Sequence, residues 1–256
     1  INKISILLPT YNCEGSIKST LESISWADEI IVVDSFSNDN TLSITEDFGA
    51  IIIKHEYINS AKQKNWAIQH CNNEWVLQID SDEELNKDAE SIIRRAISSV
   101  GKNVHCYKMP RKNFVLGKWV RYGGFYPDWQ FRLFRKKYGR WLDKEVHSKV
   151  IVPGEINVLN TPIIHHGMPN ISKQLANLDR YTKYEANQLS KIGKNFSYIK
   201  WLAGPIYIFI KRYFMLMGFR DGWRGLFLSI YTAFYVFVSY AKLLEKQILK
   251  SKGIKL

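Results

Sequence analysis

The sequence predicts an α/β protein with a mostly parallel sheet flanked by helices, followed by a helical region that is basic and apolar. Apolar runs of strand length alternate with segments of about ten residues that suit helices, the order of β-α units with parallel strands. Two of these runs end in an aspartate, Asp34 and Asp80. Because the carboxyl ends of parallel strands share one edge of a sheet, both acids are expected to face one ligand there.

The first hundred residues contain four expected strands and the helices between them. Pro9 stops the first strand, and turn residues precede the second helix. Further along, alternation of apolar and polar side chains from Trp129 to Phe134 has the period of a strand. The expected strands are 4–8, 29–33, 50–53, 75–79, 129–134 and a pair within 141–152, and the expected helices are 14–24, one from Thr41, 60–70 and 86–99.

Four carboxylates follow the fourth strand within five residues: Asp80, Asp82, Glu83 and Glu84. Clustered carboxylates repel one another unless a positive group joins them, and a divalent cation that also holds a phosphate is a suitable partner. The alternative is an acidic turn that starts a helix. The chain has neither G-x-G-x-x-G nor G-x-x-x-x-G-K-[ST], so those phosphate-binding loops are not expected. We expect Asp80 and Asp82 to be the functional pair, and Glu83 and Glu84 to be mainly the exposed start of the next segment.

Charge is distributed unevenly along the chain. Residues 1–100 hold 8 Lys and Arg against 16 Asp and Glu, whereas residues 101–256 hold 28 against 8. A basic half can meet nucleic acid, an anionic membrane or an acidic substrate, or form a solvated surface. No recognised nucleic-acid motif is present, so nucleic acid is not an expected partner. Three cysteines without metal-type spacing suit a reducing compartment.

Residues 168–256 are expected to form a membrane-associating helical region, separate from the α/β domain at 1–167. Residues 171–193 have the spacing of an amphipathic helix. Residues 225–241 carry no charge over 17 residues, a helix of roughly 25 Å against a bilayer core of about 30 Å. We therefore favour helices that lie at or dip into the membrane surface, with a span or a buried core helix as alternatives.

Several motifs resemble those of the inverting family-2 glycosyltransferases with the GT-A fold. They are ISILLPTYN at 4–12, IVVDS at 31–35 and IDSDE at 79–83, in the family's order and at strand ends. GFYPDWQFRLFR at 124–135 and Val146-His147 are similar to the branch of bacterial lipopolysaccharide-core glycosyltransferases of the WaaE/KdtX type, as is GFRDGWRGL at 218–226. The resemblance implies a nucleotide-sugar donor linked to uridine diphosphate. By the same resemblance, this donor is bound by Pro9, Tyr11, Asp34, Lys62, Asp80 and Ser81.

The resemblance also implies a metal site and a catalytic base. Asp80 and Asp82 match the D-x-D motif that holds Mg²⁺ or Mn²⁺, and His147 is placed like a histidine that completes this site. His165 and His166 are alternatives for that role. Asp128 lies where the family carries its catalytic base, although the family's frequent Glu-Asp pair is Pro-Asp here.

These expectations describe a metal-dependent inverting glycosyltransferase on the cytoplasmic face of the inner membrane, peripheral or monotopic. Its acceptor would be the lipopolysaccharide core or another lipid-linked glycan, with polyprenyl phosphate or a protein as alternatives. The absence of Gln-x-x-Arg-Trp argues against a processive synthase. A non-catalytic nucleotide-binding membrane scaffold is the alternative from another class. The donor sugar and the oligomeric state stay open.

Overall fold

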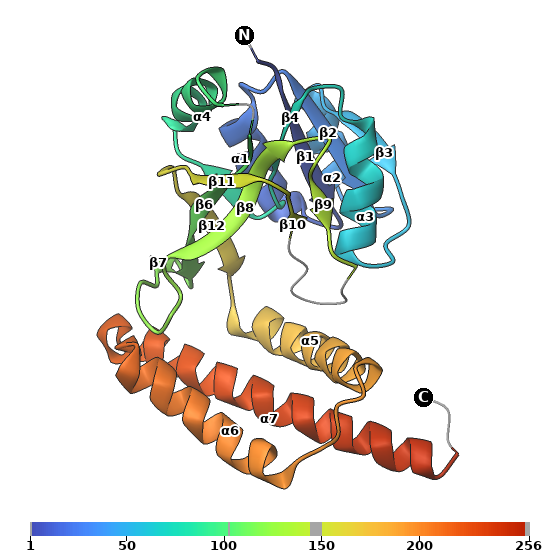
Figure 1. Cartoon of the computed structure of the whole chain (residues 1–256), viewed down its shortest axis with the longest axis vertical. Coiled ribbons are helices and arrows are strands. Elements are labelled where there is room, and N and C mark those ends of the chain that lie inside the picture. The colour runs from blue at the N-terminus through green and yellow to red at the C-terminus, as the bar shows by residue number, and fades with distance from the viewer. Residues whose placement is uncertain (1, 102, 144–149, 254–256) are drawn as a thin grey trace. The chain divides into compact units, whose positions relative to one another are not determined.

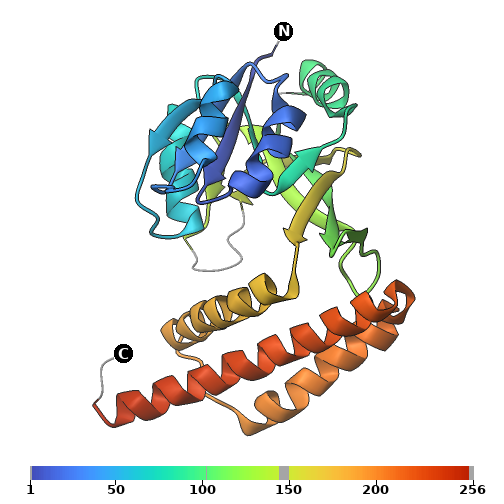
Figure 2. The same ribbon diagram turned by 180° about the vertical axis from the view of Figure 1, so that it is seen from behind.

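The structure is a computed structural model that describes residues 2–101, 103–143 and 150–253, and it divides into two compact units. Residues 1–112 and 128–167 form the first unit, and residues 113–127 and 168–256 form the second. The sequence places residues 113–127 in the first domain, but they cluster with the helical unit. Figures 1 and 2 show the chain from two sides.

The first unit begins with four parallel strands and the helices that connect them. The register joins β1 to β2 and β4, and β2 to β3, all parallel. Apolar side chains dominate β1, β2 and β4, which are largely buried, whereas β3 is an edge strand with Ile51 50% exposed. The elements are β1 (Ile4–Thr10), α1 (Glu14–Ile24), β2 (Glu29–Asp34), α2 (Thr41–Asp47), β3 (Ile51–Lys54), α3 (Ser60–Ala67) with a 3₁₀ turn (Ile68–His70), and β4 (Trp75–Gln78).

Alternate residues of the strands enter two cores on opposite faces of the sheet. In β1, Ile6 and Leu8 pack in one cluster with side chains of α1 and α4 (Ala89–Ser98). Leu7 points the other way and packs with Ala61 and Ala67 of α3. The two-residue period of a strand thus separates the layers. The mostly parallel sheet flanked by helices is the fold that the sequence predicts.

The remainder of the sheet is mixed. Beyond β4 the strand order continues as β8, β6, β12 and β5, and β8 runs antiparallel to both β4 and β6. β8 therefore starts at the edge where β4 ends. The added strands are β5 (Glu83–Leu85), β6 (Val104–Val115), β7 (Lys118–Trp119), β8 (Asp128–Arg135), β11 (Glu155–Val158) and β12 (Ile163–Met168), with β9 (Arg140–Trp141) and β10 (Val150–Ile151) as a separate pair.

The second unit consists of three helices and the loop at 113–127. The helices are α5 (Ile171–Lys191), α6 (Tyr198–Ile210) and α7 (Trp223–Ser251), with a π turn (Lys211–Met215) and a 3₁₀ turn (Gly218–Asp221) between the last two. Asn170 caps α5 by accepting the Lys173 N–H at 2.7 Å, and Gly193 follows its end with a positive φ. α6 continues through Pro205 without ending there.

Polar contacts hold the loop at 113–127 within the second unit. The Asp221 carboxylate accepts the N–H groups of Arg121 and Tyr122, the latter at 2.7 Å. The Arg224 guanidinium donates to the carbonyl oxygens of Val115 and Leu116, both at 3.0 Å. These groups would otherwise lack partners in a loop, which explains why the segment clusters with the helices.

Candidate active site

A cavity of about 410 Å³ opens at the carboxyl end of β4. Asp80 follows β4, and Asp128 is the first residue of β8, so the antiparallel pairing of these strands brings the two acids to one edge. The cavity lies wholly within the first unit. It is lined by Lys64, Gln78, Asp80, Arg111, Asp128, Trp129, Gln130, Phe131, Arg132, Trp141 and Val150.

Two cationic side chains hold the Asp80 carboxylate. Lys64 Nζ lies 3.0 Å from Oδ1, and Arg132 Nη2 lies 2.9 Å from Oδ2. The Gln78 amide also donates to Oδ1, at 2.8 Å. Burial alone would raise the pKa of Asp80, but the charges of Lys64 and Arg132 outweigh it and hold that pKa well below its usual range. Asp80 is therefore ionised and fixed in place.

Glu83 is completely buried, contrary to the expectation that it starts an exposed segment. Its Oε1 accepts from Arg132 Nη2 at 2.6 Å and from Arg111 Nη1 at 3.2 Å, and its Oε2 accepts the Asp80 N–H at 3.0 Å. An unpaired carboxylate could not be buried at acceptable cost, so the two arginines explain its position. Glu83 also belongs to strand β5 and not to a helix, and Glu84 beside it is only half-buried.

Arg111 links this buried centre to Asp128. Its Nη2 lies 2.7 Å from Asp128 Oδ2, and the Gln130 amide donates to Oδ1 at 2.7 Å. Three carboxylates thus alternate with three cations along the site, from Lys64 to Asp128. The side chain of Asp128 remains 29% exposed and lines the cavity. A carboxylate placed in this way can accept a proton from a hydroxyl that enters the cavity.

Asp82 lies next to a histidine from β12. His165 pairs with Glu83 in the strand register, and the His166 N–H donates to the Asp82 carbonyl oxygen at 2.9 Å. This places His165 Nε2 3.6 Å from Asp82 Oδ2, whereas His166 Nε2 lies 3.4 Å from Glu84 Oε1. His147, the sequence's first choice for the metal site, lies outside the described residues.

The donor set near Asp82 fits a hard divalent cation that is bound mainly through its substrate. Among the described residues, no three His, Cys, Asp or Glu side chains gather as a ready metal cage. Mg²⁺ is commonly held by one or two carboxylates together with substrate phosphates, so a full protein cage is not required. Asp82, in the turn before β5, and His165, on β12, provide a carboxylate oxygen and an imidazole nitrogen that lie 3.6 Å apart.

The residues expected on the nucleotide side occupy the ends of β1 and β2. Tyr11 is 62% exposed, and Pro9 is partly buried. Asp34 is completely buried, and its carboxylate accepts from the Thr10 hydroxyl at 2.8 Å and from the Ser37 N–H at 2.7 Å. In the structure Asp34 therefore fixes the loop that follows β2.

Lys64, not Lys62, faces the acidic cluster. Both lie on α3, but the Lys62 side chain is 49% exposed and its Nζ is 3.8 Å from an Asp143 carboxylate oxygen. The Lys64 side chain is 10% exposed and contacts Asp80. Ser81 is half-buried, and its carbonyl oxygen accepts the Thr20 hydroxyl at 3.1 Å.

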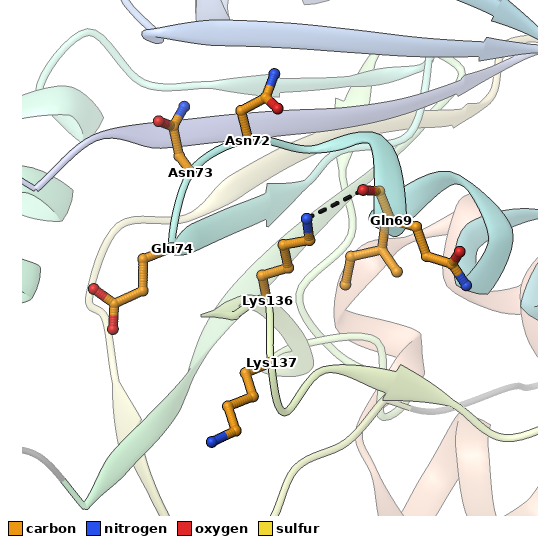
Figure 3. A pocket seen from close by; sticks show the side chains of 7 residues that line it. Gln69, Asn72, Asn73, Glu74, Lys136 and Lys137 are labelled. Atoms are coloured by element: carbon orange, nitrogen blue, oxygen red, sulfur yellow. Dashed lines mark hydrogen bonds between the residues drawn. The ribbon is translucent and has the colours of Figure 1, made fainter.

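A second hollow lies at the other end of β4. Figure 3 shows it between the loop at 72–74 and the pair Lys136-Lys137. Lys136 Nζ donates to the carbonyl oxygens of Gln69 and Cys71, at 3.1 and 2.6 Å. This lysine is engaged by the backbone, and the hollow is at the amino end of the strand, away from the acids.

Comparisons with known proteins place the chain in a family. The model of "Glycosyl transferase family 2" matches residues 5–151. A protein named an uncharacterized glycosyltransferase from Rickettsia bellii is 30% identical over 95% of this chain and 86% of its own length. The lipopolysaccharide core biosynthesis glycosyltransferase LpsC of Rhizobium meliloti is 25% identical over 97% of this chain and 94% of its own.

Solved structures with similar folds include two bacterial glycosyltransferases. One is Staphylococcus aureus TarS 1–349 in complex with UDP-GlcNAc, with a TM-score of 0.48 and 16% sequence identity. The match covers 98% of this chain and 92% of the TarS chain. The other is glucosyl-3-phosphoglycerate synthase of Mycobacterium tuberculosis in complex with Mn²⁺, UDP and glucosyl-3-phosphoglycerate, with a TM-score of 0.47 and 18% sequence identity. The match covers 77% of this chain and 82% of the synthase chain. The family model alone covers more than half of the chain, and the chain belongs to glycosyl transferase family 2.

Proposed function

We propose that this glycosyltransferase moves a sugar from a nucleoside diphosphate sugar to a lipopolysaccharide-core or other lipid-linked glycan. The transfer inverts the anomeric configuration of the sugar. The observation that carries the proposal is the position of Asp80 and Asp128 on one cavity, 48 residues apart in sequence, with Asp82 beside the first. Asp80 and Asp82 would bind on the side of the leaving diphosphate, and Asp128 would face the acceptor. Uracil is the proposed base of the donor, by the resemblance of the strand-end motifs.

The donor would occupy the edge formed by β1, β2 and β4. Pro9 and Tyr11 would line the nucleotide pocket, with Asp34 holding the loop at 35–38 beside them. The fixed carboxylate of Asp80 and the backbone around Ser81 would face the ribose and diphosphate. Lys64 can place a positive charge near the diphosphate once it exchanges partners, and the exposed Lys62 is the alternative for this role.

Mg²⁺ or Mn²⁺ would be held by Asp82, with Asp80 and His165 as further donors. When bound, such a cation stabilises the charge that the departing diphosphate gathers. His147, outside the described residues, stays a candidate ligand by resemblance. The rest of the chemistry belongs to the protein's own side chains.

Asp128 would act as the base on the acceptor side. The acceptor hydroxyl attacks the anomeric carbon, its proton passes to the Asp128 carboxylate, and the bond from that carbon to the diphosphate oxygen breaks. The nucleoside diphosphate leaves with the electron pair. A single displacement inverts the configuration, so no second carboxylate nucleophile is needed. Gln130 and Arg111 orient the Asp128 oxygens for this step.

The acceptor class rests on the relatives and on the second unit. LpsC, similar over nearly the full chain, is named for lipopolysaccharide core biosynthesis. α7 is long and apolar enough to cross a bilayer by length and composition. We propose that the enzyme associates with the cytoplasmic face of the inner membrane, where lipid-linked acceptors and nucleotide sugars meet. Polyprenyl phosphate and protein acceptors are the rival choices.

A thermal-shift screen of nucleotide sugars, with and without Mn²⁺, tests the donor assignment. A true donor is expected to raise the melting temperature only with the metal, by an amount that grows with its concentration. Transfer is then measured with that donor and a membrane extract from a bacterium deficient in core sugars. A donor that binds but is never transferred or hydrolysed would favour the non-catalytic scaffold instead.

A further inference from the structure

Helices α6 and α7 both expose apolar side chains, and they meet where Trp201 of α6 stacks on Phe237 of α7, which in turn stacks on Phe234. Ile199, Leu202, Ile206 and Ile210 recur at helical spacing along α6 and are 45–79% exposed. Ile230 and Phe234 continue the surface on α7 and are 53% and 48% exposed. We call these six side chains the apolar face. A surface of this extent in a folded unit marks a contact with a partner.

The opposite side of α7 is occupied by the amphipathic helix α5. α5 lies along α7 on the side away from α6 in both views (Figures 1 and 2). Lys242 Nζ donates to Asp179 Oδ1 at 2.8 Å, Lys246 Nζ to Asn187 Oδ1 at 2.6 Å, and the Tyr231 hydroxyl to the Gln174 carbonyl oxygen at 3.2 Å. These bonds run from residue 231 to 246, about 22 Å of helix.

This pairing decides how α7 can meet a bilayer. If α7 crossed the membrane upright, α5 would be drawn into the hydrocarbon beside it. The exposed charges of α5 include Lys173, Arg180 and Lys183, and each would cost roughly 2.5–3.5 kcal/mol at the bilayer centre. An orientation parallel to the surface avoids this cost, because it leaves α5 in water and turns the apolar face toward the acyl chains.

The charge of the region selects an anionic lipid surface as the partner. Residues 168–256 hold 15 Lys and Arg against 4 Asp and Glu. Lys200 and Lys211 lie at the two ends of α6, beside the exposed apolar side chains. Tyr198 and Tyr207, 67% and 56% exposed, are of the type enriched at the lipid headgroup level.

We propose that α6 and α7 lie in the plane of an anionic bilayer, with the apolar face in the acyl boundary and α5 on the water side. The proposal deepens the membrane association of the proposed function and is independent of the transfer chemistry. It excludes α7 as a transmembrane span although its length would allow one. The lipid surface, rather than a second copy of the chain, is the occupant that the surrounding positive charge fits.

Cysteine labelling distinguishes the in-plane orientation from a span. Lys118→Cys lies on the loop that Arg224 binds at the start of α7, and Ser251→Cys lies at its end, both at exposed positions. Each full-length variant is treated with a membrane-impermeant maleimide in spheroplasts and in inverted vesicles. Both positions should react in inverted vesicles and stay protected in spheroplasts. Reaction of the two on opposite sides would overturn the proposal. The unsubstituted protein controls for Cys13, Cys71 and Cys106.

Vesicle binding tests the apolar face itself. The full chain is sedimented with vesicles of phosphatidylglycerol and phosphatidylcholine, or of phosphatidylcholine alone. Wild type should bind the anionic vesicles more tightly, and Ile206→Glu with Ile230→Glu should weaken binding at least tenfold. Leu175→Glu on α5, 51% exposed, is the matched control and should bind as wild type does.

The remaining outcomes of the vesicle assay contradict the proposal in different ways. Equal loss in the control variant would mean that the apolar face is not the contact. A wild-type dimer that ignores vesicles and dissociates on Ile206→Glu would make the face a protein interface. Absence of sugar transfer by a protein that binds vesicles and labels as expected would instead refute the enzymatic proposal alone.

Discussion

Charge is used in opposite ways in the two units of this protein. In the first, three carboxylates and three cations alternate through the cavity, with Glu83 buried among the arginines. In the second, positive side chains surround an exposed apolar face and leave it uncharged. Paired charges at fixed positions suit the binding of an ionic donor and the transfer of a proton. Positive side chains on the same unit as exposed apolar ones suit a surface whose contacts need not be specific.

The largest effect is expected from substitution of Asp128, the proposed base on the acceptor side of the cavity. Asp128→Asn keeps the size of the side chain but removes the base, so kcat should fall by about 10²–10⁴-fold. Donor binding, followed by thermal shift, should stay within about twofold of wild type. Asp47→Asn, at an exposed aspartate in the last turn of α2, is the control and should leave kcat unchanged. Full activity of Asp128→Asn would remove Asp128 from the proposed mechanism.

Removal of the buried Glu83 carboxylate should lower the free energy of unfolding more than removal of a charge at the surface does. Glu83→Ala leaves Arg132 and Arg111 facing each other without their shared partner, at a cost of roughly 3–5 kcal/mol in the free energy of unfolding. Glu84→Ala, half-exposed in the next position, should cost at most about 1 kcal/mol. Urea unfolding measures both. Equal costs would show that burial of Glu83 adds nothing beyond an exposed ion pair.

Lys64 and Lys62 offer a matched pair on one helix. Lys64→Met should raise the donor KM about tenfold, equivalent to about 1.4 kcal/mol, and Lys62→Met should change it by less than about twofold. The reverse ranking would restore Lys62 as the residue that faces the donor.

The same variant changes the pH dependence of stability. Because the folded pKa of Asp80 is lowered, its contribution is complete above the usual aspartate value of 3.8 and is lost as the pH falls through the lower folded pKa. Lys64→Met removes one cause of that lowering. The free energy of unfolding should therefore fall less steeply in acid for the variant than for wild type, as measured by urea unfolding in a pH series. An unchanged slope would mean that Arg132 alone maintains the shift.

The smallest effect is expected from one charge beside the apolar face. Lys200→Gln should weaken binding to phosphatidylglycerol vesicles about fivefold, since a basic residue near such a surface contributes about 1 kcal/mol. The difference should shrink at high salt because screening weakens the attraction. A loss that salt does not change would point to an altered helix start rather than to charge.

The strands that carry the site were predictable, because each is identified by a short local pattern in the sequence. An apolar run that ends in Asp80-Ser81-Asp82 identifies a strand end, and alternation from Trp129 to Phe134 identifies the strand that β8 forms. The parallel half of the sheet then follows from the order of the elements. Boundaries were less accurate: the helix expected at 86–99 begins at Ala89, and the short strand β5 before it was not expected.

The partners within the site were not predictable from such patterns. Glu83 is buried because Arg132 and Arg111 reach it from 49 and 28 residues away in sequence. His165 lies beside Asp82 only through the pairing of β12 with β5. Lys62 and Lys64 differ by two positions on one helix, roughly 200° around its axis, and only packing shows which of them faces the acids.

The loop at 113–127 has a consequence for how this protein can be recombined with its relatives. Its N–H and carbonyl groups are bonded to Asp221 and Arg224, more than 90 positions later in the chain. A chimera that exchanges only residues 168–256 would leave the host's loop facing a foreign helix start. A chimera that folds is therefore expected only when residues 113–127 and 168–256 are exchanged together.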